Sequence, residues 1–107
     1  MKLSQAVREG CKQSLPTTVN LLERDSAGGL LACALGAAHL GIGGTPDMSD
    51  RDVYEELSEI WPELLTDCVT DEFIQSEVNL EVRLWHRSDT LLWTREAIAD
   101  WLESEGY

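Results

Sequence analysis

Apolar side chains recur at helical spacing in several segments of this chain, and we expect each of these segments to form a helix. The segments are residues 4–12, 30–40, 50–60 and 95–103. Residues that cap helix starts precede or begin three of them, namely Ser4, Ser49 or Asp50, and Thr94. A further short segment, Pro62–Leu65, begins with a proline, which favours the first helical position. We therefore predict one all-α domain of four to five short helices over residues 1–107.

The segment 30–40 is the expected centre of the fold. It is rich in alanine and glycine, and small side chains let a helix lie close to its neighbours. The glycines of residues 41–44 are expected to end this helix, and Gly28–Gly29 marks a loop before it. The short apolar run Val19–Glu23 fits either an extended segment or a helical turn.

The segment Asp71–His86 fits two periodicities at once. Its apolar residues at positions 78, 80, 82 and 84 alternate with polar ones, which is typical of a half-buried strand. Apolar residues at positions 74, 78, 82 and 85 also step at helical spacing. Because the rest of the chain offers no convincing strand to pair with, and a lone strand leaves its backbone groups unsatisfied, we interpret the segment as a helix.

The last expected helix carries the clearest apolar face. Ile98 and Trp101 share this face, and Arg95 is expected on the solvent side. Trp93, just before the helix, is placed to pack on Ile98 as a hydrophobic staple. We expect Trp85, Trp93 and Trp101 to meet in one cluster where this helix docks.

Acidic residues are concentrated in one part of the chain. The formal net charge is −12, and residues 47–81 hold twelve Asp and Glu side chains against a single basic residue, Arg51. Like charges repel, so such a surface disfavours nucleic-acid phosphates and anionic membranes as partners. We therefore expect neither nucleic acid nor a membrane to bind directly.

The acids of the third expected helix and of the turn after it are the predicted partner-binding residues. They are Asp50, Asp52, Glu55, Glu56, Glu59 and Glu63. We predict a small, non-catalytic protein-interaction module whose acidic helix face docks a basic protein, with an attraction that weakens with salt. Two alternatives use the same acids: a solvated surface that keeps the protein soluble, or a phage-type DNA mimic that inhibits a nucleic-acid enzyme.

Cysteine usage and the apolar segments indicate a cytoplasmic protein. The three cysteines, Cys11, Cys33 and Cys68, form no CxxC pair, which favours reduced thiols over disulfides or a zinc site. The first residues lack the apolar run of a secretory signal. The longest apolar stretch, residues 28–44, is too short to span a bilayer.

An alternative function is a cysteine-dependent hydrolase built on Cys33 and His86, with Asp89 to orient the imidazole. Cys33 stands near a helix start, where a thiol pKa is lowered, and the histidine follows later in the chain as in papain-like hydrolases. Against this, Cys33 lies in an alanine-rich face typical of a core, and no oxyanion donor can be identified. We therefore expect no enzymatic activity.

No metal or cofactor is expected either. The two histidines, His39 and His86, show no HxxxH or HExxH spacing. A calcium-binding loop counted from Asp50 needs glycine at its sixth position and glutamate at its twelfth, where this chain has Glu55 and Trp61. The glycines of residues 41–44 are not followed by the Lys and Ser or Thr of a phosphate-binding loop.

Three segments resemble a group of small bacterial and phage proteins without an established activity. The segments are Cys33–Ala38 (CALGAA), His86–Asp89 (HRSD) and Trp93–Leu102 (WTREAIADWL). Those proteins share a Cys-Ala-Leu-Gly-Ala-Ala helix and a C-terminal Trp-x-Arg-Glu-x-Ile-Ala-Asp-Trp helix, and members often carry a CxxC where this chain has only Cys68. The resemblance implies a helical fold and a bacterial or phage origin, and it implies no particular chemistry.

Overall fold

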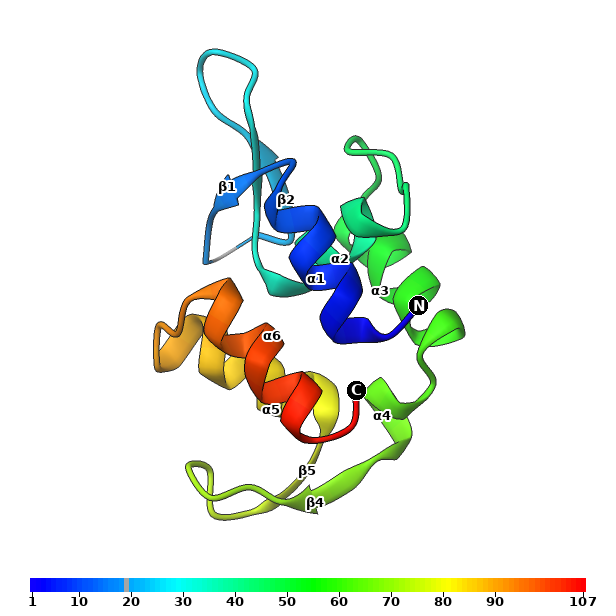
Figure 1. Ribbon diagram of the computed structural model, residues 1–107, viewed down its shortest axis with the longest axis vertical. Helices are drawn as coiled ribbons and strands as arrows, with labels where there is room; N and C mark the ends of the chain where they lie inside the picture. The colour runs from blue at the N-terminus through cyan, green and yellow to red at the C-terminus, as the bar shows by residue number, and fades with distance from the viewer. Residues whose placement is uncertain (19) are drawn as a thin grey trace.

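The computed structural model describes residues 1–18 and 20–107, which form a helix-rich fold with two small sheets (Figure 1). The helices are α1 (Leu3–Cys11), α2 (Ala34–Gly41), α3 (Asp50–Ile60), α4 (Glu63–Thr66), α5 (Leu80–Trp85), the π-helical turn η1 (His86–Thr90) and α6 (Arg95–Ser104). The strands are β1 (Leu15–Pro16), β2 (Leu22–Arg24), β3 (Leu30–Ala32), β4 (Cys68–Thr70) and β5 (Glu77–Asn79). The predicted all-α class is therefore wrong, and the fold is mixed α and β.

The first sheet takes the beginning of the expected helix 30–40. β3 lies in the middle of the sheet and pairs parallel with β1 and antiparallel with β2, so its backbone groups find partners on both edges. Cys33 is still extended (φ −76°, ψ −176°), and α2 begins only after it. The loop predicted at Gly28–Gly29 joins β2 to β3 in the hairpin that projects from one end of the molecule (Figure 1). In the run Val19–Glu23, Val19 lies outside the described residues, and Leu22 opens β2.

The second sheet explains why the segment 71–86 fits two periodicities. Residues Glu77–Asn79 form β5, which pairs antiparallel with β4, a strand that the sequence pattern did not reveal. Asn79 then caps α5, and its Oδ1 accepts a hydrogen bond from the Val82 N–H at 2.9 Å. The helical prediction is therefore correct for Leu80–Trp85 and wrong for the residues of β5.

Close packing of α1 on α2 forms the centre of the core. A Cβ atom at Gly10 would lie 1.7 Å from the Ala37 carbonyl oxygen, so only glycine permits this approach. All residues from Ala34 to Leu40 are buried, which confirms the central place predicted for this helix. α6 packs beside α1, and the Ser4 N–H donates to the Tyr107 carbonyl at 3.2 Å, so the two ends of the chain lie together (Figure 1).

Two of the predicted caps are confirmed. Ser49 accepts a hydrogen bond from the Asp52 N–H at 3.3 Å, and Thr94 accepts one from the Ala97 N–H at 3.1 Å. Ser4 does not cap α1, because the helix begins one residue earlier and buries this side chain. Within the described residues, no helix is long and apolar enough to cross a membrane.

Three side chains depart from what the apolar pattern predicts; among them is Ile60, which the helical spacing of Val53, Leu57 and Ile60 places on the apolar face of the segment 50–60. Arg95 is buried, and its guanidinium donates to Ser14 Oγ at 2.8 Å and to the Ser14 carbonyl at 2.9 Å. Ile60 is exposed at the end of α3. Trp85 is 51% exposed and therefore does not join Trp93 and Trp101 in one buried cluster.

Candidate functional site

The six predicted partner-binding acids are not equivalent in the structure. Five of them lie on α3 and one on α4: Asp50, Asp52, Glu55, Glu56, Glu59 and Glu63. Asp50, Asp52 and Glu59 are exposed, and no ion pair among the described residues includes them. Glu55 is exposed and forms a 3.4 Å pair with Arg51 one turn before it. Most of the predicted acidic face is thus a row of carboxylates open to solvent.

Glu56 has a structural role instead. Its Oε2 lies 2.5 Å from Nδ1 of His39, which is fully buried. The other ring nitrogen, Nε2, donates to the Thr45 carbonyl at 2.7 Å. Glu56 therefore holds α3 and the loop after α2 together through this histidine, and its side chain remains only partly exposed.

A hollow between α3 and α5 lies beside the acidic face. It is lined by Tyr54 of α3 and by Glu81, Val82 and Trp85 of α5, and it encloses about 290 Å³. Each helix contributes an aromatic ring with an acid one turn before it, Asp50 before Tyr54 and Glu81 before Trp85. Residues four apart lie on the same side of a helix, so each carboxylate stands next to the ring that follows it. We call the space lined by Tyr54, Glu81, Val82 and Trp85 the α3–α5 hollow.

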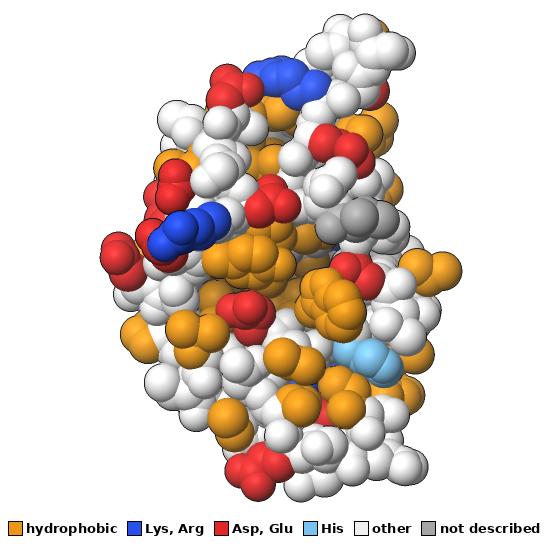
Figure 2. Space-filling view, turned by 180° about the vertical axis from the view of Figure 1, so that it is seen from behind, with side chains coloured by type: hydrophobic (Ala, Val, Ile, Leu, Met, Phe, Trp, Pro, Cys, Tyr) orange, Lys and Arg blue, Asp and Glu red, His pale blue; other side chains and the backbone are white. Residues whose placement is uncertain are grey.

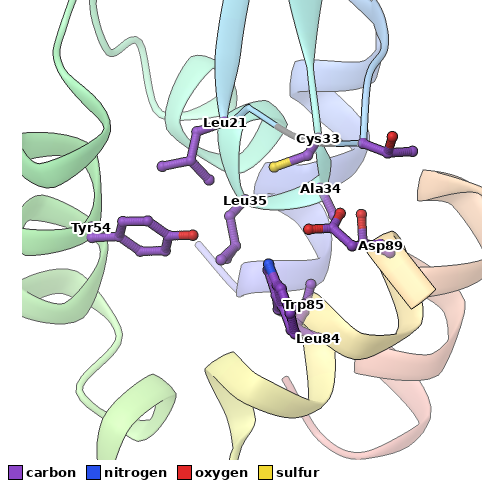
Figure 3. A pocket seen from close by; sticks show the side chains of 10 residues that line it. Leu21, Cys33, Ala34, Leu35, Tyr54, Leu84, Trp85 and Asp89 are labelled. Carbon is purple, nitrogen blue, oxygen red and sulfur yellow. The ribbon is translucent and has the colours of Figure 1, made fainter. Parts of the chain in front are cut away.

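The space-filling view shows the open face of this region, and the close-up shows its two aromatic walls. In Figure 2, hydrophobic side chains gather around a depression in the middle of the face, and acidic side chains stand around it. In Figure 3, Tyr54 points from α3 across toward Trp85 of α5, with Cys33 and Asp89 further along the same cavity. The exposed fractions of Trp85, 51%, and Val82, 38%, show that this apolar surface is open to solvent.

A narrow recess continues inward from the hollow. Tyr54 and Trp85 line both spaces, and the recess adds Thr18, Leu21, Cys33, Ala34, Leu35, Leu84, Ser88 and Asp89. The π-helical turn η1 follows α5 directly and carries Ser88 and Asp89 to this wall. The volume of the recess is about 20 Å³, which is room for about one water molecule.

Burial and negative charge dominate the electrostatics of this region. Burial, followed by the nearby Cys33, Glu81, Asp50 and Asp89, raises the pKa of Tyr54 to about 12. Burial also raises the pKa of Glu81, and it raises that of Asp89 although a hydrogen bond from Ser88 opposes the shift. No ion pair among the described residues includes Asp50, Glu81 or Asp89. The carboxylates around the hollow are therefore unneutralised by the described part of the chain.

The surroundings of Cys33 favour the protonated thiol. Burial raises its pKa, and the charges of Asp89 and Asp50 act in the same direction. Hydrogen bonds from the backbone N–H groups of Gly36 and Leu35 at the start of α2 oppose the shift. His86 is not among the described residues that line the recess, and its Nδ1 is buried without a hydrogen-bond partner among them. The structure thus does not bring the proposed base to this thiol.

A second cluster of charges and rings, which the sequence pattern did not predict, lies in the interior. Arg87 is fully buried, and its Nη1 lies 2.8 Å from Oδ1 of Asp71, which is also fully buried. Arg83 Nε donates to the same oxygen at 3.0 Å. The guanidinium of Arg87 lies over the rings of Trp101, Phe73 and Trp93, at 4.1, 5.1 and 5.4 Å from their centroids. We call these six residues the arginine cluster.

The charge of Asp71 is strongly favoured in this cluster. Burial alone would raise its pKa, but hydrogen bonds from Arg83, the Ile74 N–H, Arg87 and the Phe73 N–H together lower it well below the usual range. The two backbone N–H groups each donate at 3.0 Å to Oδ2. Asp71 therefore holds the loop between β4 and β5 against the helical segment that follows it.

Comparisons of the chain with protein-family models, with curated proteins and with solved structures found no match. The candidate site therefore rests on the geometry alone. Tyr54, Glu81 and Trp85 are residues of the hollow that the sequence analysis did not assign to a site, whereas Asp89 was considered only as part of a hydrolase. The signal of the first three was the repeated spacing of an acid and an aromatic residue four positions apart, on two helices far apart in the sequence.

Proposed function

We propose that this protein is a non-catalytic protein-interaction module that binds a basic partner protein through the acidic face of α3 and the adjoining α3–α5 hollow. One observation carries the proposal: exposed aromatic and aliphatic surface is surrounded by carboxylates for which the described residues supply no counter-charge. Apolar contact supplies affinity at such a surface, and the unpaired charge selects and steers a basic protein.

The same region supports binding better than catalysis. Cys33 is the nucleophile that a hydrolase would use, and it lies in a recess with room for about one water molecule. Burial and two neighbouring carboxylates keep its thiol protonated, whereas a nucleophilic cysteine needs a lowered pKa. We therefore assign the region to recognition.

The test compares two variants of equal net charge. In the first, three exposed acids of α3 are reversed: Asp50→Lys, Asp52→Lys and Glu59→Lys. In the control, three exposed acids outside the region are reversed: Glu72→Lys, Glu77→Lys and Glu96→Lys. Each variant and the wild type are immobilised, exposed to bacterial lysate, and washed at low and then at high salt. Circular dichroism verifies the fold of each.

We expect the wild type and the control to retain the same basic proteins at low salt and to release them at high salt. The α3 variant is expected to retain none of them. Equal retention by all three proteins, or retention of proteins that are not basic, would contradict the proposal. A basic nuclease among the retained proteins would direct the proposal toward inhibition by DNA mimicry.

A further inference from the structure

The α3–α5 hollow is shaped to receive one particular chemical group of a basic partner. We infer that it binds the guanidinium of an arginine side chain, stacked between Tyr54 and Trp85 and hydrogen-bonded to the carboxylates beside them. The inference rests on the proposed function, since the arginine belongs to the partner protein. It goes further, because it names the group that enters the hollow and the residues that recognise it.

The molecule already contains an arginine site built from the same components. In the arginine cluster, the Arg87 guanidinium lies 4.1 Å from the centroid of the Trp101 ring and 2.8 Å from a carboxylate oxygen of Asp71. Aromatic rings attract a cation over their faces, and a carboxylate accepts hydrogen bonds in the plane of the guanidinium. The hollow supplies the same two kinds of group, and the described residues place no cation between them.

The two walls of the hollow come from different helices, which gives it the form of a slot. Tyr54 projects from α3 and Trp85 from α5 (Figure 3), and Glu81 of α5 lines the same hollow. The charge of Asp50 also acts on Tyr54. A planar guanidinium can stack on a ring while its N–H groups reach carboxylates at the edges. The compact ammonium of lysine can do only one of these well, so the slot favours arginine.

The arginine must come from another molecule, because each arginine of this chain already has a partner within the protein. Arg8 pairs with Asp100 and Glu103, and Arg24 pairs with Asp47. The other arginines are engaged as well: Arg51 pairs with Glu55, Arg83 and Arg87 with Asp71, and Arg95 donates to Ser14. None of the eight basic residues of the chain lines the hollow. Charge complementarity thus points to a partner with an exposed arginine.

The test uses three blocked pentapeptides, identical except at the central residue, which is arginine, lysine or citrulline. Citrulline keeps the shape of arginine and lacks its charge. Each peptide is titrated into the full-length protein while the indole N–H signal of Trp85 is followed by ¹H–¹⁵N NMR. We expect the arginine peptide to shift this signal saturably, the lysine peptide to bind several-fold more weakly, and the citrulline peptide to leave it unchanged.

Variants of the wall and of the rim complete the experiment. Because Trp85→Ala and Trp85→Phe remove the indole that reports on binding, their titrations are followed by the backbone amide signals of Glu81 and Val82. Trp85→Ala should weaken binding of the arginine peptide by about two- to thirtyfold, the range expected for loss of a cation–π contact, and Trp85→Phe should recover part of it. Glu81→Gln should also weaken binding, whereas Glu72→Gln on the β4–β5 loop should not. For Trp85→Ala, the retained dispersion of the other signals shows that the protein is folded, and Glu81→Gln tests the same site without removing a ring.

The outcomes separate this inference from the proposed function. If arginine, lysine and citrulline peptides behave alike, or if Glu81→Gln matches Glu72→Gln, the guanidinium site is refuted even when the charge-reversed α3 variant loses its basic partners. If the arginine peptide binds as expected but reversal of the α3 acids leaves partner retention unchanged, the guanidinium site stands and the acidic docking face falls.

Discussion

The arginine cluster and the α3–α5 hollow lie on two sides of the same helix and use the same kinds of side chain. α5 contributes Arg83 to the cluster, and it contributes Glu81 and Trp85 to the hollow. In the cluster, the chain supplies the cation itself, and Arg87 is fully buried between a carboxylate and three rings. In the hollow, rings and carboxylates are present without a cation among the described residues.

This difference distinguishes a site that the chain fills with its own cation from one to which the described residues supply none. In the cluster, Asp71 pairs with both arginines and the less buried Glu105 also pairs with Arg83, so the interaction energy is used for folding. Around the hollow, burial raises the pKa of Glu81 and of Asp89, which means that the charged form of each carboxylate is less favourable there than in water. A cationic ligand would supply the missing counter-charge, which is what the proposed function requires of the hollow.

The largest expected effect breaks the cluster. Asp71→Asn keeps the shape of the side chain and an oxygen for the two backbone N–H groups, but it leaves Arg83 and Arg87 without a buried counter-charge. We expect a loss of about 3–5 kcal/mol in the free energy of unfolding, measured by urea denaturation at pH 7. Glu72→Gln, one residue along and exposed, should change it by less than about 0.5 kcal/mol. Similar values for the two variants would show that the cluster is not a structural centre.

The second prediction concerns acid. The pKa of Asp71 is lower in the folded than in the unfolded protein, so its contribution is present above the unfolded value, about 3.9, and is lost as the pH falls toward the folded value. Stability of the wild type should therefore decline below about pH 4 by up to about 1.4 kcal/mol per pH unit from this group. Asp71→Asn should show a shallower decline over the same range. Parallel curves for the two proteins would mean that folding does not lower the pKa of Asp71.

The sequence predicted the helices whose ends carry a local signal. α3 and α6 begin after Ser49 and Thr94, which cap them through their own side chains. The strands have no comparable signal, because each of them is two or three residues long and exists only through pairing with a distant segment. β3 consists of Leu30–Ala32, residues with good helical propensity, and pairing on both of its edges overrides that preference.

The candidate site was predictable only in part for a related reason. The acidity of α3 is visible in the sequence, and most of the predicted acids are exposed. The hollow needs residues 54 and 85 side by side, and a helical periodicity cannot show which neighbour a given face meets. Trp85 therefore looked like a partner for Trp93 and Trp101, while the residue that joins those two rings is the buried Arg87.

The third prediction concerns the reactivity of Cys33, which lines the recess behind the hollow. Cys33 is mostly enclosed and its pKa is raised, whereas Cys68 on β4 is exposed. A water-soluble thiol reagent at pH 7 should modify Cys68 at least about tenfold faster than Cys33 in the folded protein, because Cys68 is exposed whereas Cys33 is mostly enclosed and its raised pKa lowers its thiolate fraction. Mass spectrometry of proteolytic fragments locates the labels. Equal or faster labelling of Cys33 would restore the hydrolase alternative.

The smallest expected effect is a difference in stability between the wild type and Glu81→Gln, measured with the hollow free and with it occupied by peptide. Since burial raises the folded-state pKa of Glu81, its contribution to stability is fully present below the unfolded pKa and is lost as the pH rises through the folded value. Glu81→Gln should therefore be slightly more stable than the wild type at pH 7 and equal to it near pH 3, where both side chains are neutral. Adding the arginine pentapeptide at pH 7 should reverse the order, because only the carboxylate gains a counter-charge from it. If Glu81→Gln is less stable than the wild type when both are measured without peptide, then Glu81 stabilises the fold. The hollow would in that case be a shallow counterpart of the arginine cluster and not a site for a partner.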